Sequence, residues 1–415
     1  MTGTSETTIV ASGGSAAADA GAQNWATRYG AEMMNTFAPP ARLLVRGEGC
    51  RVWDSDGVEY LDFLAGIAVN VLGHAHPALV GAITEQAAKL VHVSNYFATE
   101  PQLALAERLL RLTGAGRAGR VFFANSGTEA NEAAFKLARL AKPGGRILAL
   151  EESFHGRSMG SMALTGKPAM RAPFEPMPGG VQHLPSTVEA LEAAMGDDVA
   201  ALIVEPIKGE AGVLELPEGY LAAARELTAR HGALLILDEV QTGVGRTGAW
   251  FAFQHDGIVP DAITLAKGLA GGVPIGALVT FGAASGLMHP GQHGTTFGGN
   301  PLATACGDAV LAEIERADLV ANAARRGDEL RALIEGRLTA VPGGSLIGGT
   351  RGRGLMIGIA LTRSVGHALF EACLDVGLIV SSPNETTIRL VPPLIVGDAE
   401  VADFGTRFAA ALAAV

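Results

Sequence analysis

Short apolar runs alternate with helical patterns through the middle of the chain. Between about residues 76 and 300, apolar positions recur every three to four residues in segments such as 102–112 and 129–140. Short apolar strands that alternate with such helices predict a mostly parallel sheet with helices on both faces. The predicted strands are residues 121–124, 146–150, 200–204, 233–237, 262–266 and 276–281.

The two ends of the chain have other patterns. Residues 51–62 alternate around an Asp-Gly pair, which predicts a β-hairpin. After about residue 305 come two helices, a strand at 354–360, another helix, and strands near Gly377 and Ile388. We expect this smaller α+β part to be joined in space by residues 40–75. The expected organisation is a disordered tail at 1–24, an arm and part of the small domain at 25–75, a large domain at 76–305 and a C-terminal small domain at 306–415.

Composition argues against several classes of protein. The 415 residues are 48% hydrophobic and carry a net charge of -11, opposite in sign to surfaces that bind nucleic acid or anionic membranes. No apolar run is long enough to cross a bilayer, and the N-terminus lacks the pattern of a secretory signal. The three cysteines lie far apart in the sequence and do not have the spacing of a zinc site. His74 and His76 have no third metal ligand near them in the sequence. We expect a cytoplasmic protein with no metal, no nucleic acid and no membrane contact.

One lysine stands where an α/β sheet places its ligands. Lys267 follows the apolar run 263–266 and enters a glycine-rich turn. Desolvation there would lower its pKa and leave free amine at neutral pH, as a nucleophilic lysine requires. The alternative is that Lys267 simply follows the end of a strand and extends its amine into solvent, with no function.

Two segments offer sites for an anion. Ser126, Gly127 and Thr128 open a helix directly after a strand, which suits a phosphate group, although an ordinary helix cap has the same pattern. The loop 293–301 is rich in glycine and threonine, and its hydroxyls suit an oxyanion or a flexible turn equally well.

Three acids also lie at predicted strand ends, and one arginine lies within an apolar segment. Asp238 ends the most apolar run, where a carboxylate needs a partner such as a protonated ring nitrogen or a buried arginine. Glu205 and Glu210 are either partners for an arginine or solvated loop acids. Arg389 lies between apolar residues ahead of Pro-Pro and therefore requires a carboxylate.

Phe154 and Arg157 together could stack on a flat ring and bind a carboxylate. The alternative is that Phe154 belongs to the core and Arg157 to the solvated surface.

Two motifs suggest other classes of enzyme, but neither has the structural context that its class requires. Residues 243–248 match G-x-G-x-x-G, but they do not open a helix from a strand, as a nicotinamide oxidoreductase requires. Residues 156–160 match the G-x-S-x-G elbow of a serine hydrolase around Ser158, but five residues separate it from its strand.

Taken together, and in their order along the chain, the motifs indicate one kind of chemistry. A phosphate site, a stacking aromatic, an acid for a ring nitrogen and a reactive lysine describe pyridoxal phosphate chemistry. From about residue 30 to the C-terminus the chain resembles the class III pyridoxal-phosphate aminotransferases. The motifs that carry the resemblance are N-S-G-T-E-A-N-E (125–132), F-H-G-R (154–157), E-P-I-K-G-E (205–210), L-D-E-V-Q-T-G (237–243), L-A-K-G (265–268), H-G-T-T-F-G-G-N-P (293–301) and I-R-L-V-P-P-L (388–394).

The resemblance implies a fold-type-I homodimer with shared active sites, a mostly parallel seven-stranded sheet in the large domain and a smaller α+β domain. It assigns pyridoxal 5′-phosphate as the cofactor, with amino acids and 2-oxo acids as substrates. A relative that kept only the fold would normally have lost Lys267 or Asp238. The implied contacts are Lys267 for the covalent bond to the cofactor and for proton transfer, Asp238 for the ring nitrogen, Gln241 for the ring hydroxyl, Phe154 for the ring face, Ser126, Gly127 and Thr128 for the phosphate, Thr296 for the phosphate of the neighbouring subunit, and Arg157 and Arg389 for substrate carboxylates.

The resemblance also implies how two unlike substrates share one site. A glutamate matching Glu210 covers the arginine matching Arg389 and moves away for glutamate, which has two carboxylates. Phe37 lacks the hydroxyl that would hold free ornithine, which favours N2-acetylornithine as the amino donor. Ornithine, succinylated amines and 4-aminobutyrate remain alternatives.

Overall fold

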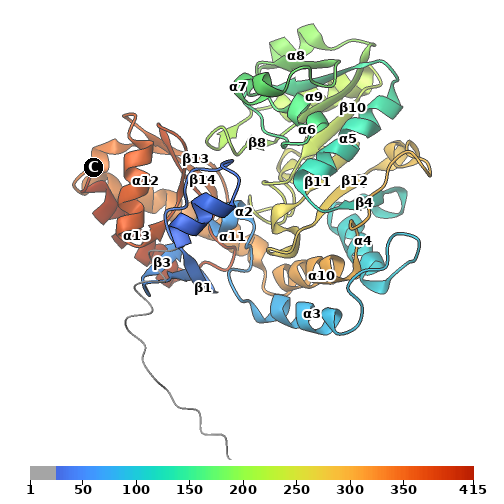
Figure 1. The fold of residues 1–415 in the computed structure, drawn as a ribbon. Coiled ribbons are helices and arrows are strands. Elements are labelled where there is room, and N and C mark those ends of the chain that lie inside the picture. The colour runs from blue at the N-terminus through green and yellow to red at the C-terminus, as the bar shows by residue number, and fades with distance from the viewer. Residues whose placement is uncertain (1–24) are drawn as a thin grey trace, which may run out of the picture.

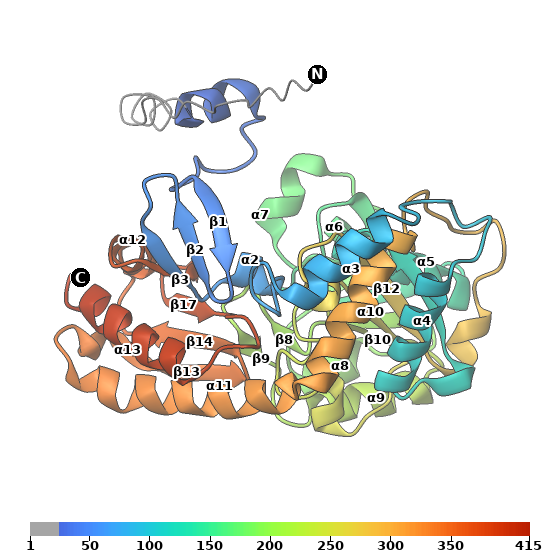
Figure 2. The same cartoon turned by 90° about the horizontal axis from the view of Figure 1, so that it is seen from below.

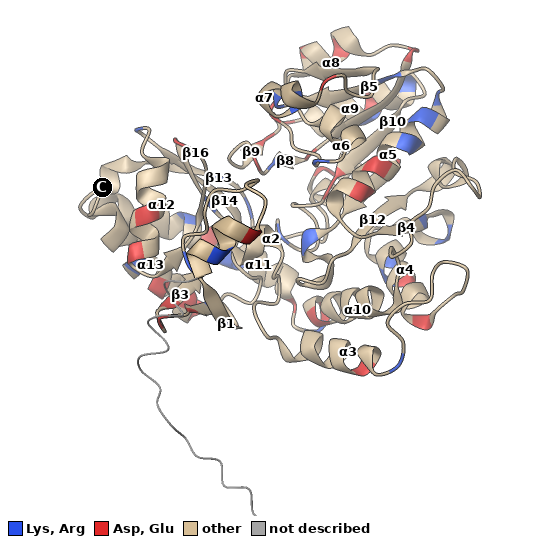
Figure 3. Ribbon diagram, in the orientation of Figure 1, with Lys and Arg blue, Asp and Glu red and all other residues tan. Residues whose placement is uncertain are grey.

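The computed structural model describes residues 25–415 and builds them on separate large and small sheets (Figure 1). The predicted tail, residues 1–24, lies outside the described residues. Acidic and basic residues are interspersed over both parts rather than gathered by sign (Figure 3). Within residues 25–415, no helix combines the length and the apolar character needed to cross a bilayer.

The largest sheet has seven strands in the order β4-β12-β11-β10-β7-β5-β6. β12 is antiparallel to both neighbours and the remaining pairs are parallel, which confirms the mostly parallel sheet. β6 was not predicted, because this edge strand has the half-polar sequence Val-Gln-His-Leu. The strands are β4 (Arg120–Ala124), β5 (Arg146–Leu150), β6 (Val181–Leu184), β7 (Val199–Val204), β10 (Leu234–Asp238), β11 (Ala262–Leu265) and β12 (Gly276–Thr280).

Alternate residues of these strands face opposite helical layers, since both faces of a mostly parallel sheet are buried. Leu235 and Leu237 of β10 join the hydrophobic cluster that includes α4, α9 and α10, whereas Ile236 joins the cluster of α5 and α6. These helices are α4 (Glu100–Leu112), α5 (Gly127–Ala141), α6 (Met159–Leu164), α9 (Tyr220–Arg230) and α10 (Pro301–Arg316), and α3 (Pro77–Ala87) packs on α10.

The smaller part has two four-stranded sheets. One is antiparallel, in the order β13-β14-β17-β16. The other joins the N-terminal hairpin to the C-terminal region, because Leu61 of β3 pairs with Leu378 of β15 (Figure 2). The elements are β1 (Leu44–Glu48), β2 (Arg51–Asp54), β3 (Glu59–Asp62), α11 (Leu319–Glu335), β13 (Ile347–Arg353), β14 (Met356–Leu361), α12 (Gly366–Asp375), β15 (Leu378–Ile379), β16 (Ser381–Asn384), β17 (Thr387–Leu390) and α13 (Asp398–Leu412).

The predicted hairpin is confirmed as the antiparallel pair β2 and β3. β1 and β13 were not predicted, because neither has an apolar alternation. β1 is largely exposed, and β13 contains three glycines and two arginines. Both strands form through pairing with neighbours that carry the hydrophobic signal.

Candidate active site

A cavity of about 380 Å³ lies at one end of the seven-stranded sheet. Its walls come from the segments that follow β4, β5, β7, β10 and β11, because parallel strands bring their carboxyl ends to one edge. The predicted site residues that line it are Ser126, Gly127, Thr128, Phe154, Arg157, Glu210, Asp238, Gln241 and Lys267.

Lys267 begins the 3-10 turn Lys267–Ala270 directly after β11. Its φ is 43°, a left-handed value that is strained for a side-chain-bearing residue and is typical of functional sites. Burial lowers the pKa of Lys267, while the charge of Glu210 opposes this shift. The amine is therefore more nucleophilic at neutral pH than a surface lysine. The next residue must be glycine, because a Cβ at Gly268 would lie 2.6 Å from Cγ1 of Val71.

The N-terminus of α5 offers a candidate site for an anion. Ser126 caps the helix, since its Oγ accepts from the N–H of Glu129 at 3.3 Å. The N–H groups of Gly127 and Thr128 have no carbonyl within the helix to bond, and the helix dipole favours a negative charge beside them. Glycine is needed at Gly127 because a Cβ would meet Cγ1 of Val240 at 2.9 Å.

The hydroxyl of Thr128 also binds the backbone of the loop that carries Arg157. Its Oγ1 accepts from the N–H groups of Arg157 and Ser158, both at 3.1 Å. The cap and the loop that presents Arg157 are thus one hydrogen-bonded unit.

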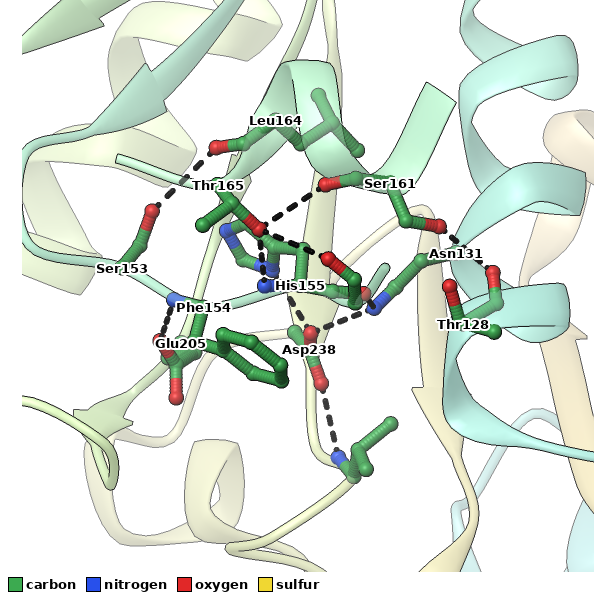
Figure 4. Close-up of polar contacts among 12 residues, drawn as sticks. Thr128, Asn131, Ser153, Phe154, His155, Ser161, Leu164, Thr165, Glu205 and Asp238 are labelled. Atoms are coloured by element: carbon green, nitrogen blue, oxygen red, sulfur yellow. Dashed lines mark hydrogen bonds and ion pairs between the residues drawn. The ribbon is translucent and has the colours of Figure 1, made fainter. Parts of the chain in front are cut away.

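Asp238 is buried and held by two donors that the sequence analysis missed (Figure 4). Its Oδ2 accepts from Nδ1 of His155 and from Nδ2 of Asn131, each at 2.7 Å, and its Oδ1 accepts from the N–H of Val240 at 3.0 Å. The alternative of a buried arginine partner is wrong. Burial alone would lower the pKa of His155, but the hydrogen bond and charge of Asp238 outweigh it and raise that pKa. The imidazole and the carboxylate therefore form a buried hydrogen-bonded pair at the wall of the cavity.

The signal for these donors was present in the sequence. A carboxylate at the end of an apolar strand requires donors, and both Asn131 and His155 belong to motifs that follow other predicted strands. Asn131 also donates to the backbone carbonyl of His155 at 2.7 Å, which fixes the imidazole relative to α5.

Glu205 positions the aromatic wall of the cavity. Its Oε1 accepts from the N–H of Phe154 at 2.8 Å and its Oε2 from the N–H of Gly209 at 3.2 Å. Burial raises the pKa of Glu205. The Arg157 guanidinium lies 5.8 Å from the centroid of the Phe154 ring, so the two predicted partners do lie together.

Glu210 is the acid that pairs with an arginine. Nη1 of Arg389 lies 2.5 Å from Oε1 of Glu210 and also donates to Oε1 of Gln241 at 3.2 Å. Burial alone would raise the pKa of Glu210, but the charges of Arg389 and Lys267 hold it at about 2. Arg389 comes from β17 of the smaller part, so this ion pair lies where the two parts meet. Glu210 lines the cavity, whereas Arg389 is buried and does not.

Two predicted residues lie outside this cavity. Phe37 precedes β1 and is 74% exposed. Thr296 is exposed and lines a separate hollow with residues 92–95. Their proposed contacts with substrate and cofactor therefore remain predictions.

The rival motifs have structural roles. Arg246, within the G-x-G-x-x-G match, is fully buried and donates to the carbonyls of Leu355 and Pro392, so it joins the two parts of the chain. Ser158 precedes α6, and its Oγ accepts from the hydroxyl of Thr128, while His155 is engaged with Asp238. Neither motif has the geometry of the enzyme it suggests.

The cavity fits pyridoxal phosphate. It joins a helix N-terminus that suits an anion, an aromatic wall, a buried carboxyl group and an amine of lowered pKa in a volume typical of ligand pockets. The buried carboxyl group of Asp238 lines the cavity and would suit a protonated ring nitrogen.

Comparison with known proteins identifies the family of this chain. The family model for class III aminotransferases matches residues 33–412, and the chain belongs to this family of pyridoxal-phosphate enzymes. The acetylornithine aminotransferase of Mycolicibacterium smegmatis is 54% identical over 93% of this chain and 97% of its own length. The ornithine aminotransferase of Toxoplasma gondii has a TM-score of 0.89 at 32% identity, over 94% of this chain and 95% of that one. The N-acetylornithine aminotransferase of Stenotrophomonas maltophilia has a TM-score of 0.78 at 39% identity, over 91% and 96%.

Proposed function

We propose that this aminotransferase moves the δ-amino group between N2-acetyl-L-ornithine and 2-oxoglutarate, giving N-acetylglutamate 5-semialdehyde and glutamate, in arginine biosynthesis. Similarity to acetylornithine aminotransferases over most of both chains supports this substrate. The observation that carries the proposal is the Glu210–Arg389 pair beside Lys267, because it provides a second carboxylate site that can be masked.

Each of the cavity residues has a separate role in the proposed reaction. When bound, pyridoxal phosphate supplies an electron sink for the bonds at the reacting carbon. Lys267 holds the cofactor covalently through Nζ and, when that amine is free, accepts and returns the proton of the reacting carbon. Asp238 holds a proton on the ring nitrogen, and the α5 N-terminus binds the phosphate.

The substrates are held by the two arginines. Arg157 binds the α-carboxylate that both substrates share. Arg389 binds the second carboxylate of glutamate once Glu210 has moved, and Glu210 neutralises Arg389 when the neutral acetyl amide occupies the site. A buried arginine left unpaired would cost several kcal/mol.

Glu210→Ala is expected to change the relative use of the two amino donors. Without Glu210, glutamate reaches Arg389 without displacing a carboxylate, while N2-acetylornithine leaves Arg389 unpaired. We expect the ratio of kcat/KM for N2-acetylornithine to that for glutamate to fall by about tenfold or more, in line with about 1–3 kcal/mol for an unsatisfied buried group. Steady-state kinetics of both half-reactions measures this ratio.

Glu215→Ala is the control for this variant. Glu215 pairs with Arg353 at 3.0 Å, outside the cavity, and its loss should leave the ratio unchanged. An unchanged ratio in Glu210→Ala would refute the proposal that Glu210 covers Arg389 for one substrate and moves away for the other.

A panel of amino donors tests the proposed function itself. We expect kcat/KM for N2-acetylornithine to exceed that for ornithine and for 4-aminobutyrate by at least about tenfold, because Phe37 has no hydroxyl for a free α-amine. N2-succinylornithine and succinyl-diaminopimelate belong in the same panel. A higher kcat/KM for any other member would reassign the substrate.

We further propose a cytoplasmic homodimer with shared sites. Tyr96, Phe97 and Phe297 are 92%, 67% and 62% exposed, and large exposed aromatics in one region suit a protein interface. Thr296 lies next to Phe297 and is free to reach the site of a partner subunit. Three buried, unpaired cysteines among the described residues suit a reducing compartment.

A further inference from the structure

The loop that carries Arg157 into the cavity is the segment 156–160, which matches G-x-S-x-G. The Arg157 side chain is exposed, so the position of its guanidinium depends mainly on the backbone that carries it. Ser158, which precedes α6, makes no side-chain hydrogen bond to cap that helix. The N–H groups of the loop and of the first turn of α6 therefore need acceptors from another segment.

Two side chains of α5 supply these acceptors. Oε1 of Glu132 accepts from the N–H groups of Gly160 and Ser161, at 2.8 and 3.0 Å. One turn earlier on the same face of α5, Thr128 binds the two N–H groups at the start of the loop. Ser161 adds a further contact, because its Oγ donates to the carbonyl of Thr128 at 2.7 Å (Figure 4).

The two glycines of the motif allow this close approach. A Cβ at Gly156 would lie 2.3 Å from Oγ1 of Thr128. A Cβ at Gly160 would lie 2.4 Å from Oε2 of Glu132, and its three nearest atoms all belong to that carboxylate. The G-x-S-x-G pattern therefore marks the surface by which this loop packs on α5.

We propose that Glu132 is a positioning residue for substrate binding, which holds residues 156–161 against α5 and so determines where Arg157 meets a substrate carboxylate. This inference rests on the proposed function, in which Arg157 binds the α-carboxylate of both substrates. The N-terminus of α5 also offers the candidate phosphate site, so one helix determines where Arg157 lies relative to that site. Glu132 itself does not line the cavity, and it acts on the substrate only through Arg157.

Glu132→Ala is expected to weaken the binding of both amino donors. Without the two hydrogen bonds the loop is no longer fixed to α5, and Arg157 is less often in the position that meets the carboxylate. We expect KM for N2-acetylornithine and for glutamate to rise alike, by about tenfold, with kcat changed by less than about threefold. Steady-state kinetics with each donor measures both constants.

Glu132→Gln is the matched control. Both hydrogen bonds end on Oε1, and an amide oxygen in the same place can accept them, so KM should stay within about twofold of that of the unsubstituted protein. Calorimetric titration of the cofactor-loaded enzyme with 2-oxoglutarate gives a second readout without turnover, because a 2-oxo acid has no amino group to transfer. Its Kd should rise in Glu132→Ala and not in Glu132→Gln.

Gly160→Ala disturbs the same contact without removing a polar group. The added Cβ displaces the Glu132 carboxylate, whereas alanine favours a helix more than glycine does. KM should therefore rise about as in Glu132→Ala, while the thermal midpoint stays close to that of the unsubstituted protein. An effect of Glu132 on folding alone predicts no rise in KM for Gly160→Ala.

A double-mutant cycle with Arg157→Ala separates this inference from the proposed function. Glu132→Ala should have no further effect on KM when residue 157 is already alanine. An unchanged KM in Arg157→Ala alone would overturn the role of Arg157 in the proposed function. If Arg157→Ala raises KM, then an unchanged KM in Glu132→Ala or Gly160→Ala, or an equal effect of Glu132→Ala in both backgrounds, would overturn the positioning role of Glu132 alone.

Discussion

Lys267→Ala is expected to lower kcat for N2-acetylornithine by about 10³-fold or more. In the proposed mechanism, the variant loses both the amine that holds the cofactor and the group that moves the proton, and proton transfer alone contributes about 10²–10⁴-fold in enzymes. The folded structure should survive, because the substitution removes a partly buried amine and leaves no charged partner isolated, since Glu210 keeps its bond to Arg389. Single-turnover kinetics and a thermal melt measure the two effects separately.

Lys267→Arg is the matched control for charge. A guanidinium stays protonated at neutral pH, so it keeps the positive charge but is neither a nucleophile nor a base. We expect it to be as inactive as Lys267→Ala. Substantial turnover in either variant would show that the reacting amine lies elsewhere.

Asp238→Asn has the second largest expected effect, a loss of about 10²–10³-fold in kcat. The amide keeps the size of the carboxylate but removes the charge that holds a proton on the ring nitrogen, and breaking a buried ion pair costs about 3–5 kcal/mol. The absorption spectrum of the bound cofactor should shift as well, because its ring nitrogen loses the proton. Kinetics and the visible spectrum of the purified variant check both results.

The chain contains a second Asp–His pair that serves as the control. Oδ2 of Asp62 lies 2.8 Å from Nε2 of His74, and Asp62 does not line the cavity. Asp62→Asn should lower the thermal midpoint and leave the cofactor spectrum unchanged. The same spectral shift in both variants, or normal turnover in Asp238→Asn, would contradict the role of Asp238.

The apolar strands could be predicted because each is buried on both faces. The runs around Leu148, Leu202 and Leu235 have no polar interruption and lie in the middle of the sheet. Edge and small-domain strands such as β6, β1 and β13 escaped prediction, because pairing with a neighbour rather than side-chain burial places them in a sheet.

The positions of the site residues followed from the sheet topology. Residues that end parallel strands must meet at one edge, which brought Asp238, Lys267 and Ser126 together in the cavity. The sequence also indicated that Arg389 requires an acid. The residues alone left Glu205 and Glu210 as equal candidates, and only the family resemblance indicated Glu210. The choice depends on how β17 of the smaller part packs against the loop after β7.

The donors to Asp238 also could not be identified from the sequence, because their contacts depend on tertiary packing. His155 and Asn131 lie 83 and 107 residues from Asp238 in the sequence, and their meeting depends on the strand order and on the register of α5 against the sheet. Thr296 and Phe37 are a different case, since the contacts proposed for Thr296 involve a second subunit and Phe37 is exposed and does not line the cavity of its own chain.

The central claim is that one amine, the Nζ of Lys267, bonds covalently to the cofactor. The most direct measurement is borohydride reduction of the holoenzyme, followed by proteolysis and mapping of the peptide that carries the reduced cofactor. Our account predicts a single modified peptide containing Leu265-Ala266-Lys267-Gly268, with the label on the lysine. A label on any other lysine, or no label at all, would contradict it.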